Sequence, residues 1–284
     1  MKKIYGKPVN LVLLSVFMIS VWFGSAPARA DAVLDWNTIA VNTAVANHQN
    51  PFAQARYAAI VHLAVFEAVN SITGEYKPYL GTITAPPGAS AEAAAIEAAY
   101  HVLSTYFPAS SSALLAARTN SLAQIPDGQA KSDGIAIGDA VASAVIALRA
   151  NDGSSPPQFK VPGPAVPGEW QATPSCPVVN GVAVGIAFQW QNITPFGIPS
   201  ASDFLLGPPP ALTSNEYAKT YNEVMTVGGI DSSERPQDRS DVALFYAASS
   251  PTQVFNQGPA SRSGTRTFAL RKCPRPGPDQ HRHE

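Results

Sequence analysis

The feature that most constrains this chain is an apolar helical segment between residues 52 and 71. Asn50-Pro51 precedes it and Gly74 follows it. Proline suits the first turn of a helix and disfavours helix in the residue before it, so these residues mark the boundaries. Its apolar residues fall on most sides of the helix: Ala55, Ala58, Ala59, Ile60, Leu63, Ala64, Val65, Phe66, Ala68 and Val69. A helix that is apolar nearly all round must be buried, so other helices have to cover it.

Further helices are predicted from apolar spacing and from the helix breakers between segments. The predicted ranges are 34–48, 90–106, 112–125, 129–149, 213–227 and 238–248. Within 129–149, Gly134, Gly138 and Ala142 recur every four residues, a spacing that leaves a shallow groove for a close helix crossing. A phosphate-binding role for these glycines is disfavoured, because no glycine-rich loop follows a strand here.

Residues 151–211 have a different character, because they contain twelve prolines. Proline at this density excludes a regular helix or a central strand. The stretch also contains large apolar residues and so is no solvated linker: Trp170, Phe188, Trp190, Phe196, Phe204 and Leu205. We therefore expect an extended segment that wraps over the helical body, with a short hairpin in 178–188 around Asn180-Gly181. The predicted fold is all-α: a helical bundle with a long proline-rich irregular segment wrapped over it.

The charge is distributed unevenly along the chain. The 284 residues have a net charge of −1, but residues 1–30 carry +4, residues 31–257 carry −9 and residues 258–284 carry +4. The hydrophobic content of 45% excludes a wholly disordered chain. The overall charge argues against a nucleic-acid binder, so no nucleic-acid partner is predicted.

The basic N-terminal segment is predicted to be a signal peptide, residues 1–30. Lys2, Lys3 and Lys7 precede an apolar run from 11 to 23, and the small-x-small sequence Ala28-Arg29-Ala30 follows. The alternative is an uncleaved membrane anchor, but the run is shorter than the roughly 20 residues that cross a bilayer. We expect cleavage after Ala30, export to a periplasm or to the outside, and no membrane span in the mature chain.

The two cysteines, Cys176 and Cys273, are too few for a disulfide-built scaffold or a cysteine-rich zinc site. In an oxidising compartment they could pair, but one pair at this separation in sequence does not decide it.

Known catalytic motifs are missing from the sequence, including H-E-x-x-H, G-x-S-x-G, the Walker A loop and the dinucleotide fingerprint. His48, His62 and His101 are the histidines of the body, and His62 is interpreted as a hydrogen-bonded core residue rather than a ligand. His281 and His283 at the C-terminal end could bind a metal only weakly.

Four charged residues of the body invite a functional interpretation. Arg56 and Glu67 share a helix face about three turns apart, so each needs a partner from elsewhere if it is buried. A structural salt bridge is favoured over catalysis for this pair. Glu216 and Glu223 share a face of another helix, which solvated acids explain equally well. We therefore assign no catalytic, cofactor-binding or metal-binding residue in this chain.

The order of several short motifs is more informative than any single residue. These motifs are Trp36-Asn37, Asn50-Pro51, the helix Gln54–Asn70, Tyr76-Lys77-Pro78-Tyr79, Ile125-Pro126-Asp127-Gly128, Ala147–Gly153, Pro167-Gly168-Glu169-Trp170, Thr194-Pro195-Phe196, Gly207–Ser214 and Tyr221-Asn222-Glu223-Val224. In this order they resemble the N-terminal portion of exported bacterial proteins similar to vanadium-dependent haloperoxidases, within the type 2 phosphatidic acid phosphatase superfamily. The resemblance covers residues 31–257.

The resemblance implies an all-helical bundle whose oxyanion site lies in its later helices. In the family, a lysine, an Arg-Pro pair, Ser-Gly-His and a final arginine and histidine hold vanadate or phosphate. Clustered cations neutralise an oxyanion, and a neutral imidazole is the nucleophile. Halide oxidation by hydrogen peroxide with vanadate, or phosphate ester hydrolysis, is the reaction that this site implies.

The family's site motifs are absent from this sequence. Arg275-Pro276 is an isolated dipeptide with Lys272 too close to it, and Ser263-Gly264 is followed by Thr265 instead of histidine. Residues 258–284 form a basic, proline-rich tail that we expect to be disordered or out of frame.

The predicted function is therefore that of a truncated member of this family, inactive alone. No cofactor is expected for this chain, whereas vanadate belongs to the full-length family. A homo-oligomer or a complementing polypeptide is a possible partner. The alternative is a non-catalytic, exported helical protein with a binding or structural role.

Overall fold

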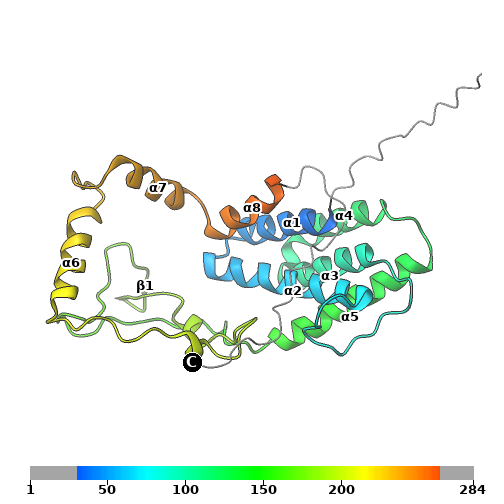
Figure 1. Cartoon of the computed structure of the whole chain (residues 1–284), viewed down its shortest axis with the longest axis horizontal. Helices are drawn as coiled ribbons and strands as arrows, with labels where there is room; N and C mark the ends of the chain where they lie inside the picture. Colours follow the sequence, from blue (N-terminus) through cyan, green and yellow to red (C-terminus); the bar gives the residue numbers. More distant parts are fainter. Residues whose placement is uncertain (1–30, 263–284) are drawn as a thin grey trace, which may run out of the picture. The chain divides into compact units, whose positions relative to one another are not determined.

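The computed structural model describes the backbone of residues 31–262 and the side chains of residues 31–256. The described chain is mostly helical, which confirms the all-α class (Figure 1). Its eight α-helices are α1 (Ala32–Ala46), α2 (Pro51–Thr73), α3 (Ala91–Tyr106), α4 (Ser111–Leu122), α5 (Gln129–Arg149), α6 (Asn215–Val227), α7 (Gln237–Ala248) and α8 (Pro251–Arg262). The predicted signal peptide and most of the predicted tail lie outside the described residues.

Local sequence explains where the first helices begin and end. Asn50 caps α2 by accepting a hydrogen bond from the N–H of Ala53, and Pro51 occupies the first helical position. Gly74 ends α2 in the left-handed conformation, with φ of 63°. Ser90 caps α3 in the same way as Asn50 caps α2. The predicted boundaries of these helices are therefore within a few residues of the observed ones.

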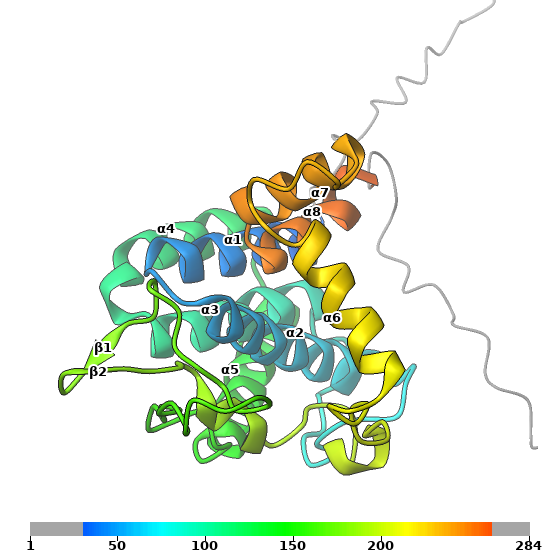
Figure 2. The same cartoon turned by 90° about the vertical axis from the view of Figure 1, so that its left-hand side faces the viewer.

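The core is built from α1, α2, α3 and α5, which pack side by side in both views (Figure 1, Figure 2). Its residues are mostly small, and their alanine side chains let the helices approach closely. Those with essentially no exposed area in α2 and α3 are Ile60, Ala64, Ala68, Ala93, Ala94, Ala98, Ala99 and Val102. The first turns of α2 depart from the expectation of burial on all sides, since Phe52 is more than half exposed.

The glycines of α5 mark the closest helix crossing, against α3. A Cβ atom at Gly138 would lie 2.5 Å from the carbonyl oxygen of Ala94 and 2.7 Å from Cβ of Glu97. At Gly134 it would lie 2.3 Å from the carbonyl oxygen of Ser90. The predicted role of the four-residue spacing in close helix packing is therefore confirmed.

Residues 150–214 contain little regular structure. Strands β1 (Val178–Val179) and β2 (Val182–Ala183) form a two-stranded antiparallel hairpin. Its turn residues Asn180 and Gly181 have φ of 50° and 79°. Positive φ at both positions is typical of a type I′ turn, so the predicted hairpin is confirmed, with strands of only two residues each. Short 3₁₀ helices in this stretch are η2 (Phe188–Asn192) and η3 (Ala201–Phe204). Another, η1 (Pro108–Ser110), lies between α3 and α4.

Helix α8 was not predicted from the sequence. Gly258 and Pro259 lie inside it, and both residue types disfavour a helix interior. Its first residue is Pro251, which is favourable at that position. Helix α8 packs against α1 and α2, so tertiary contacts stabilise a helix that local preference does not indicate.

Among the described residues, none of the helices combines the length and apolarity that crossing a membrane requires.

Candidate functional site

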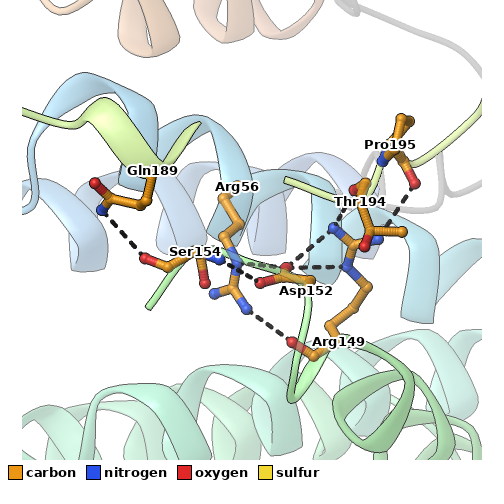
Figure 3. A network of polar contacts seen from close by, with 7 residues as sticks. All are labelled: Arg56, Arg149, Asp152, Ser154, Gln189, Thr194 and Pro195. Carbon is orange, nitrogen blue, oxygen red and sulfur yellow. Dashed lines mark hydrogen bonds and ion pairs between the residues drawn. The ribbon is translucent and has the colours of Figure 1, made fainter. Parts of the chain in front are cut away.

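A buried polar network joins α2, the end of α5 and the irregular segment that follows (Figure 3). The Nε atom of Arg56 donates to Oδ2 of Asp152 at 2.8 Å, and Nη2 donates to the carbonyl oxygen of Arg149 at 3.1 Å. The same Oδ2 atom accepts a hydrogen bond from Nε of Arg149 at 3.2 Å and lies 3.0 Å from its Nη2. One carboxylate therefore faces two guanidinium groups, whose side chains are 7% and 2% exposed.

The backbone of the irregular segment completes the network. Arg149 donates from Nη2 to the carbonyl oxygen of Thr194 at 2.7 Å and from Nη1 to that of Pro195 at 3.3 Å. The ring of Phe196 lies over the guanidinium, 3.7 Å from its Cζ atom. The N–H of Thr194 donates to the carbonyl oxygen of Asp152 at 2.7 Å. Residues 194–196 are thus fixed to the C-terminal end of α5.

Local sequence places Asp152 for this role. Arg149 lies in the last turn of α5, where a cation is favourable near the free carbonyl groups. Asp152 follows three residues later, and its Oδ1 atom accepts a hydrogen bond from the N–H of Ser154 at 3.1 Å. This side-chain-to-backbone bond forms the turn that directs Oδ2 towards the two arginines.

The pKa of Asp152 results from opposing effects. Burial acts to raise the pKa of this carboxyl group, but hydrogen bonds from Arg56 and Ser154 lower it below its ordinary value. Burial acts to lower the pKa of Arg56, and the hydrogen bond and charge of Asp152 raise it above the ordinary value. Asp152 and Arg56 are therefore both charged near neutral pH.

The network suits a structural tie better than a receptor for an oxyanion. The N–H groups of Arg149 already donate to a carboxylate and to backbone carbonyl oxygens. An incoming anion would have to displace these acceptors. The negative charge of Asp152 would also repel an anion at the point where the two cations converge. Arg56 and Arg149, the two cations that could bind an oxyanion here, already hold α2, α5 and the irregular segment together.

Glu67 has a different kind of partner from the one that a salt bridge would supply. Its side chain is buried and accepts hydrogen bonds from the backbone N–H groups of Tyr79, Leu80 and Gly81, at 2.7, 3.0 and 2.9 Å. The prediction that Arg56 and Glu67 each need a partner from elsewhere is confirmed. The partners are a distant carboxylate for the arginine and a loop backbone for the glutamate.

The predicted histidine and glutamate candidates do not meet in one site. His62 shares a 2.8 Å hydrogen bond between its Nε2 atom and Oδ1 of Asn37, and burial lowers its pKa. This confirms the interpretation as a hydrogen-bonded residue of the helical body. His101 on α3 pairs with Asp139 on α5 at 2.8 Å. Glu216 and Glu223 are exposed on α6.

Sequence reasoning missed a second charged cluster, between α3 and α4. The Nε atom of Arg118 donates to Oε2 of Glu97 at 2.6 Å, and its guanidinium lies 5.2 Å from the ring centre of Tyr100. Burial raises the pKa of Glu97, and the hydrogen bond from Arg118 opposes that effect. The only sequence signal for this pair was a glutamate in a run of alanines.

Within the described part of the chain, no group of three or more His, Cys, Asp or Glu side chains could hold a metal ion. Cys176 is a free thiol. Cys273, His281, His283 and the dipeptides Ser263-Gly264 and Arg275-Pro276 lie outside the described residues.

Helices α6 and α7 present the largest contrast with the core. Neither helix has a buried residue. Their exposed large apolar side chains are Tyr221, Val224, Met225, Val242, Leu244, Phe245 and Tyr246. The turn between the helices is held by Arg235, whose guanidinium donates to the carbonyl oxygens of Val227, Gly229 and Ile230. An ordered turn thus connects two helices whose apolar side chains are not covered by the described residues of this chain.

The chain matches no protein-family profile, no curated protein and no solved structure.

Proposed function

We propose that this chain is a helical binding part of an exported protein similar to vanadium-dependent haloperoxidases and type 2 phosphatidic acid phosphatases. Its function is to dock onto a basic helical polypeptide. The oxyanion chemistry of such an assembly, with vanadate or phosphate, belongs to that partner. The apolar surface of α6 carries this proposal.

The proposed architecture is a bundle of α1–α5 with residues 151–211 wrapped over it. Phe196 packs against the core and contacts Arg149, which supports the wrapping at one point. The arginine network supports the proposal that the oxyanion chemistry belongs to the partner. Both buried cations of this region already have partners among the described residues.

The apolar side chains of α6 form one stripe. At 3.6 residues per turn, Tyr217, Tyr221, Val224 and Met225 lie within about a third of the helix circumference. Tyr221 is 58% exposed and Met225 is 64% exposed. Glu216 and Glu223 lie together on the other side of the helix, away from this stripe. We call the four residues Tyr217, Tyr221, Val224 and Met225 the α6 stripe.

The α6 stripe is the pattern of a helix that pairs with another amphipathic helix. Residues 215–248 contain six acidic and three basic residues, so a second copy of the same surface would be repelled. A partner helix with an apolar face and a net positive charge fits both the stripe and the net negative charge of residues 215–248. This complementarity favours a complementing polypeptide over a homo-oligomer.

The docking proposal can be tested with a synthetic amphipathic helical peptide made of leucine and lysine. The full chain should bind this probe saturably in fluorescence anisotropy. Replacing Tyr221 and Met225 together with serine should weaken binding by about tenfold, because both lose most of their apolar contact area. Thr226→Ser, at an exposed position on the opposite side of α6, is the matched control. Equal affinity of all three proteins would refute the docking surface.

The proposal that the oxyanion chemistry belongs to the partner needs a separate assay. The purified chain should not oxidise halide with hydrogen peroxide and vanadate, and it should not hydrolyse a phosphate ester. Turnover above background by the purified chain would overturn the proposal and would indicate a catalytic site of its own.

A further inference from the structure

Residues 204–211, which lead from η3 into α6, form an exposed segment without a charged residue (Figure 1). Leu205 is 77% exposed and Leu206 is 94% exposed. A Cβ atom added at Gly207 would meet no atom within 4 Å beyond the adjoining residues. The described part of the chain therefore provides no cover for an apolar segment of eight residues.

The three consecutive prolines of this segment impose the polyproline II conformation. The rings of Pro208, Pro209 and Pro210 fix φ at about −65°, and a residue that precedes proline favours ψ of about 120–160°. The second rule applies to Gly207 and to the first two prolines, and the peptide bonds before all three prolines are trans. Leu205 has φ of −67° and ψ of 130°, close to the same conformation. The backbone is thus an extended helix with three residues per turn.

The segment is anchored at both ends and free between them. The N–H of Leu205 donates to the carbonyl oxygen of Ser202 at 3.3 Å, and the carbonyl oxygen of Ala211 accepts from the N–H of Ser214 at 2.8 Å. No hydrogen bond between described residues involves residues 206–210. Their carbonyl oxygens are therefore available to a donor from another molecule.

We propose that residues 205–210 bind a groove lined by aromatic side chains on a protein partner. Grooves of this kind recognise polyproline II segments, and a preformed helix loses little conformational entropy when it binds. With three residues per turn, Pro208 and Pro209 lie on neighbouring edges of the helix, so their rings form one apolar ridge. Leu205 and Leu206 extend the apolar surface at one end and give the segment a direction.

This site is separate from the α6 stripe in sequence and in chemistry. The α6 stripe is the face of an amphipathic helix and suits another helix, whereas residues 205–210 suit a groove. The inference therefore goes beyond the proposed function and does not depend on it.

The charges around the segment favour a protein partner over a lipid surface. The nearest charged residue before the segment is Asp203, and the nearest one after it is Glu216. Loops that bind anionic lipids carry clusters of lysine and arginine, which this region lacks. A groove that recognises proline rings needs no such charge.

Binding of the full chain to two dye-labelled modules, a WW domain and an EVH1 domain, tests this proposal by fluorescence anisotropy. At least one module should bind saturably, because both bind proline-rich ligands in aromatic-lined grooves. Replacing Pro208 and Pro209 together with alanine should weaken binding by about tenfold, since each position loses ring contact and its fixed φ. Pro174→Ala, which removes a proline at another exposed position, is the matched control and should leave the affinity unchanged.

Circular dichroism of each variant checks that the helices remain folded. Absence of binding to both modules would overturn the proposal, and so would equal affinity of the Pro208/Pro209 variant. Replacing Tyr221 and Met225 with serine should not affect binding, and a loss there would assign the contact to the α6 stripe instead. Phosphatidylcholine vesicles should not retain the chain, and retention that Leu206→Ser abolishes would assign the segment to a lipid surface. Either of these last results would also overturn the proposal.

Discussion

Replacement of Asp152 by alanine tests whether the buried network holds the fold together. Asp152 is the carboxylate that forms an ion pair with both Arg56 and Arg149, and both guanidiniums are nearly inaccessible to water. Removing one partner of a buried ion pair typically costs about 3–5 kcal/mol, because the remaining charge is left without compensation. Domains are stable by about 5–15 kcal/mol, so this substitution should remove about a fifth or more of the folding free energy.

Urea unfolding followed by far-ultraviolet circular dichroism measures this loss. Asp152→Ala should lower the midpoint without changing the slope of the transition. Asp152→Asn should lose less, since its amide oxygen still accepts one hydrogen bond from an arginine. Asp231→Asn changes the same charge at an exposed position and should alter the stability by less than about 0.5 kcal/mol.

The pH dependence provides an independent check. The pKa of Asp152 is lower in the folded chain than its ordinary value, so the ionised form stabilises the fold. This contribution is complete above about pH 4 and is lost as the pH falls through the lowered pKa. Asp152→Asn should lack that acid-dependent loss. A destabilisation by Asp152→Ala of less than about 1 kcal/mol would refute the reasoning, because the two arginines would then need no carboxylate.

Three further predictions concern single residues of the helical body. Burial lowers the pKa of His62, so folding favours its neutral form; stability should fall below about pH 6.5, and His62→Gln should flatten that dependence in urea titrations. Gly138→Ala should destabilise by about 1–3 kcal/mol despite better helix propensity, because its Cβ would contact the Ala94 carbonyl, and a raised melting temperature would contradict this. Glu67→Gln should cost about 1–3 kcal/mol and accelerate protease cleavage within residues 79–81, because an amide group replaces one acceptor oxygen; unchanged cleavage would show that the loop does not depend on this carboxylate.

Patterns that depend on neighbouring residues predicted most of the fold. Apolar spacing and the caps at Asn50 and Ser90 located the helices, and Asn180-Gly181 located the hairpin. Each of these signals depends on residues that are close together in the sequence, so it can be recognised without knowledge of the fold. The crossing at Gly134 and Gly138 was also predictable, because small residues at a fixed spacing leave space for a neighbouring helix.

The candidate site was predictable only in part, because its partners are far apart in sequence. The need of Arg56 for a partner follows from its place in an apolar helix, but Asp152 lies 96 residues away. The cradle of N–H groups around Glu67 requires a loop conformation that no local motif specifies. Helix α8 depends on contacts with α1 and α2, which override the preferences of Gly258 and Pro259.

The expected stability of helices α6 and α7 differs from that of the core helices. Helices of 12 or 13 residues are marginal on their own in water, and most helices gain their stability by burying an apolar face. Neither helix buries a residue here, and Arg235 secures only the turn between them. We therefore expect their amides to exchange rapidly in the isolated chain, with opening free energies near zero.

Binding of the leucine–lysine peptide should slow exchange in α6, because an apolar partner supplies the missing burial. The core helices α2 and α3 should show no change, since their side chains are already packed. Exchange in α6 as slow as in α3 without any partner would contradict this account. It would mean that the helix is stable by itself, and the apolar stripe would then be no evidence for a partner.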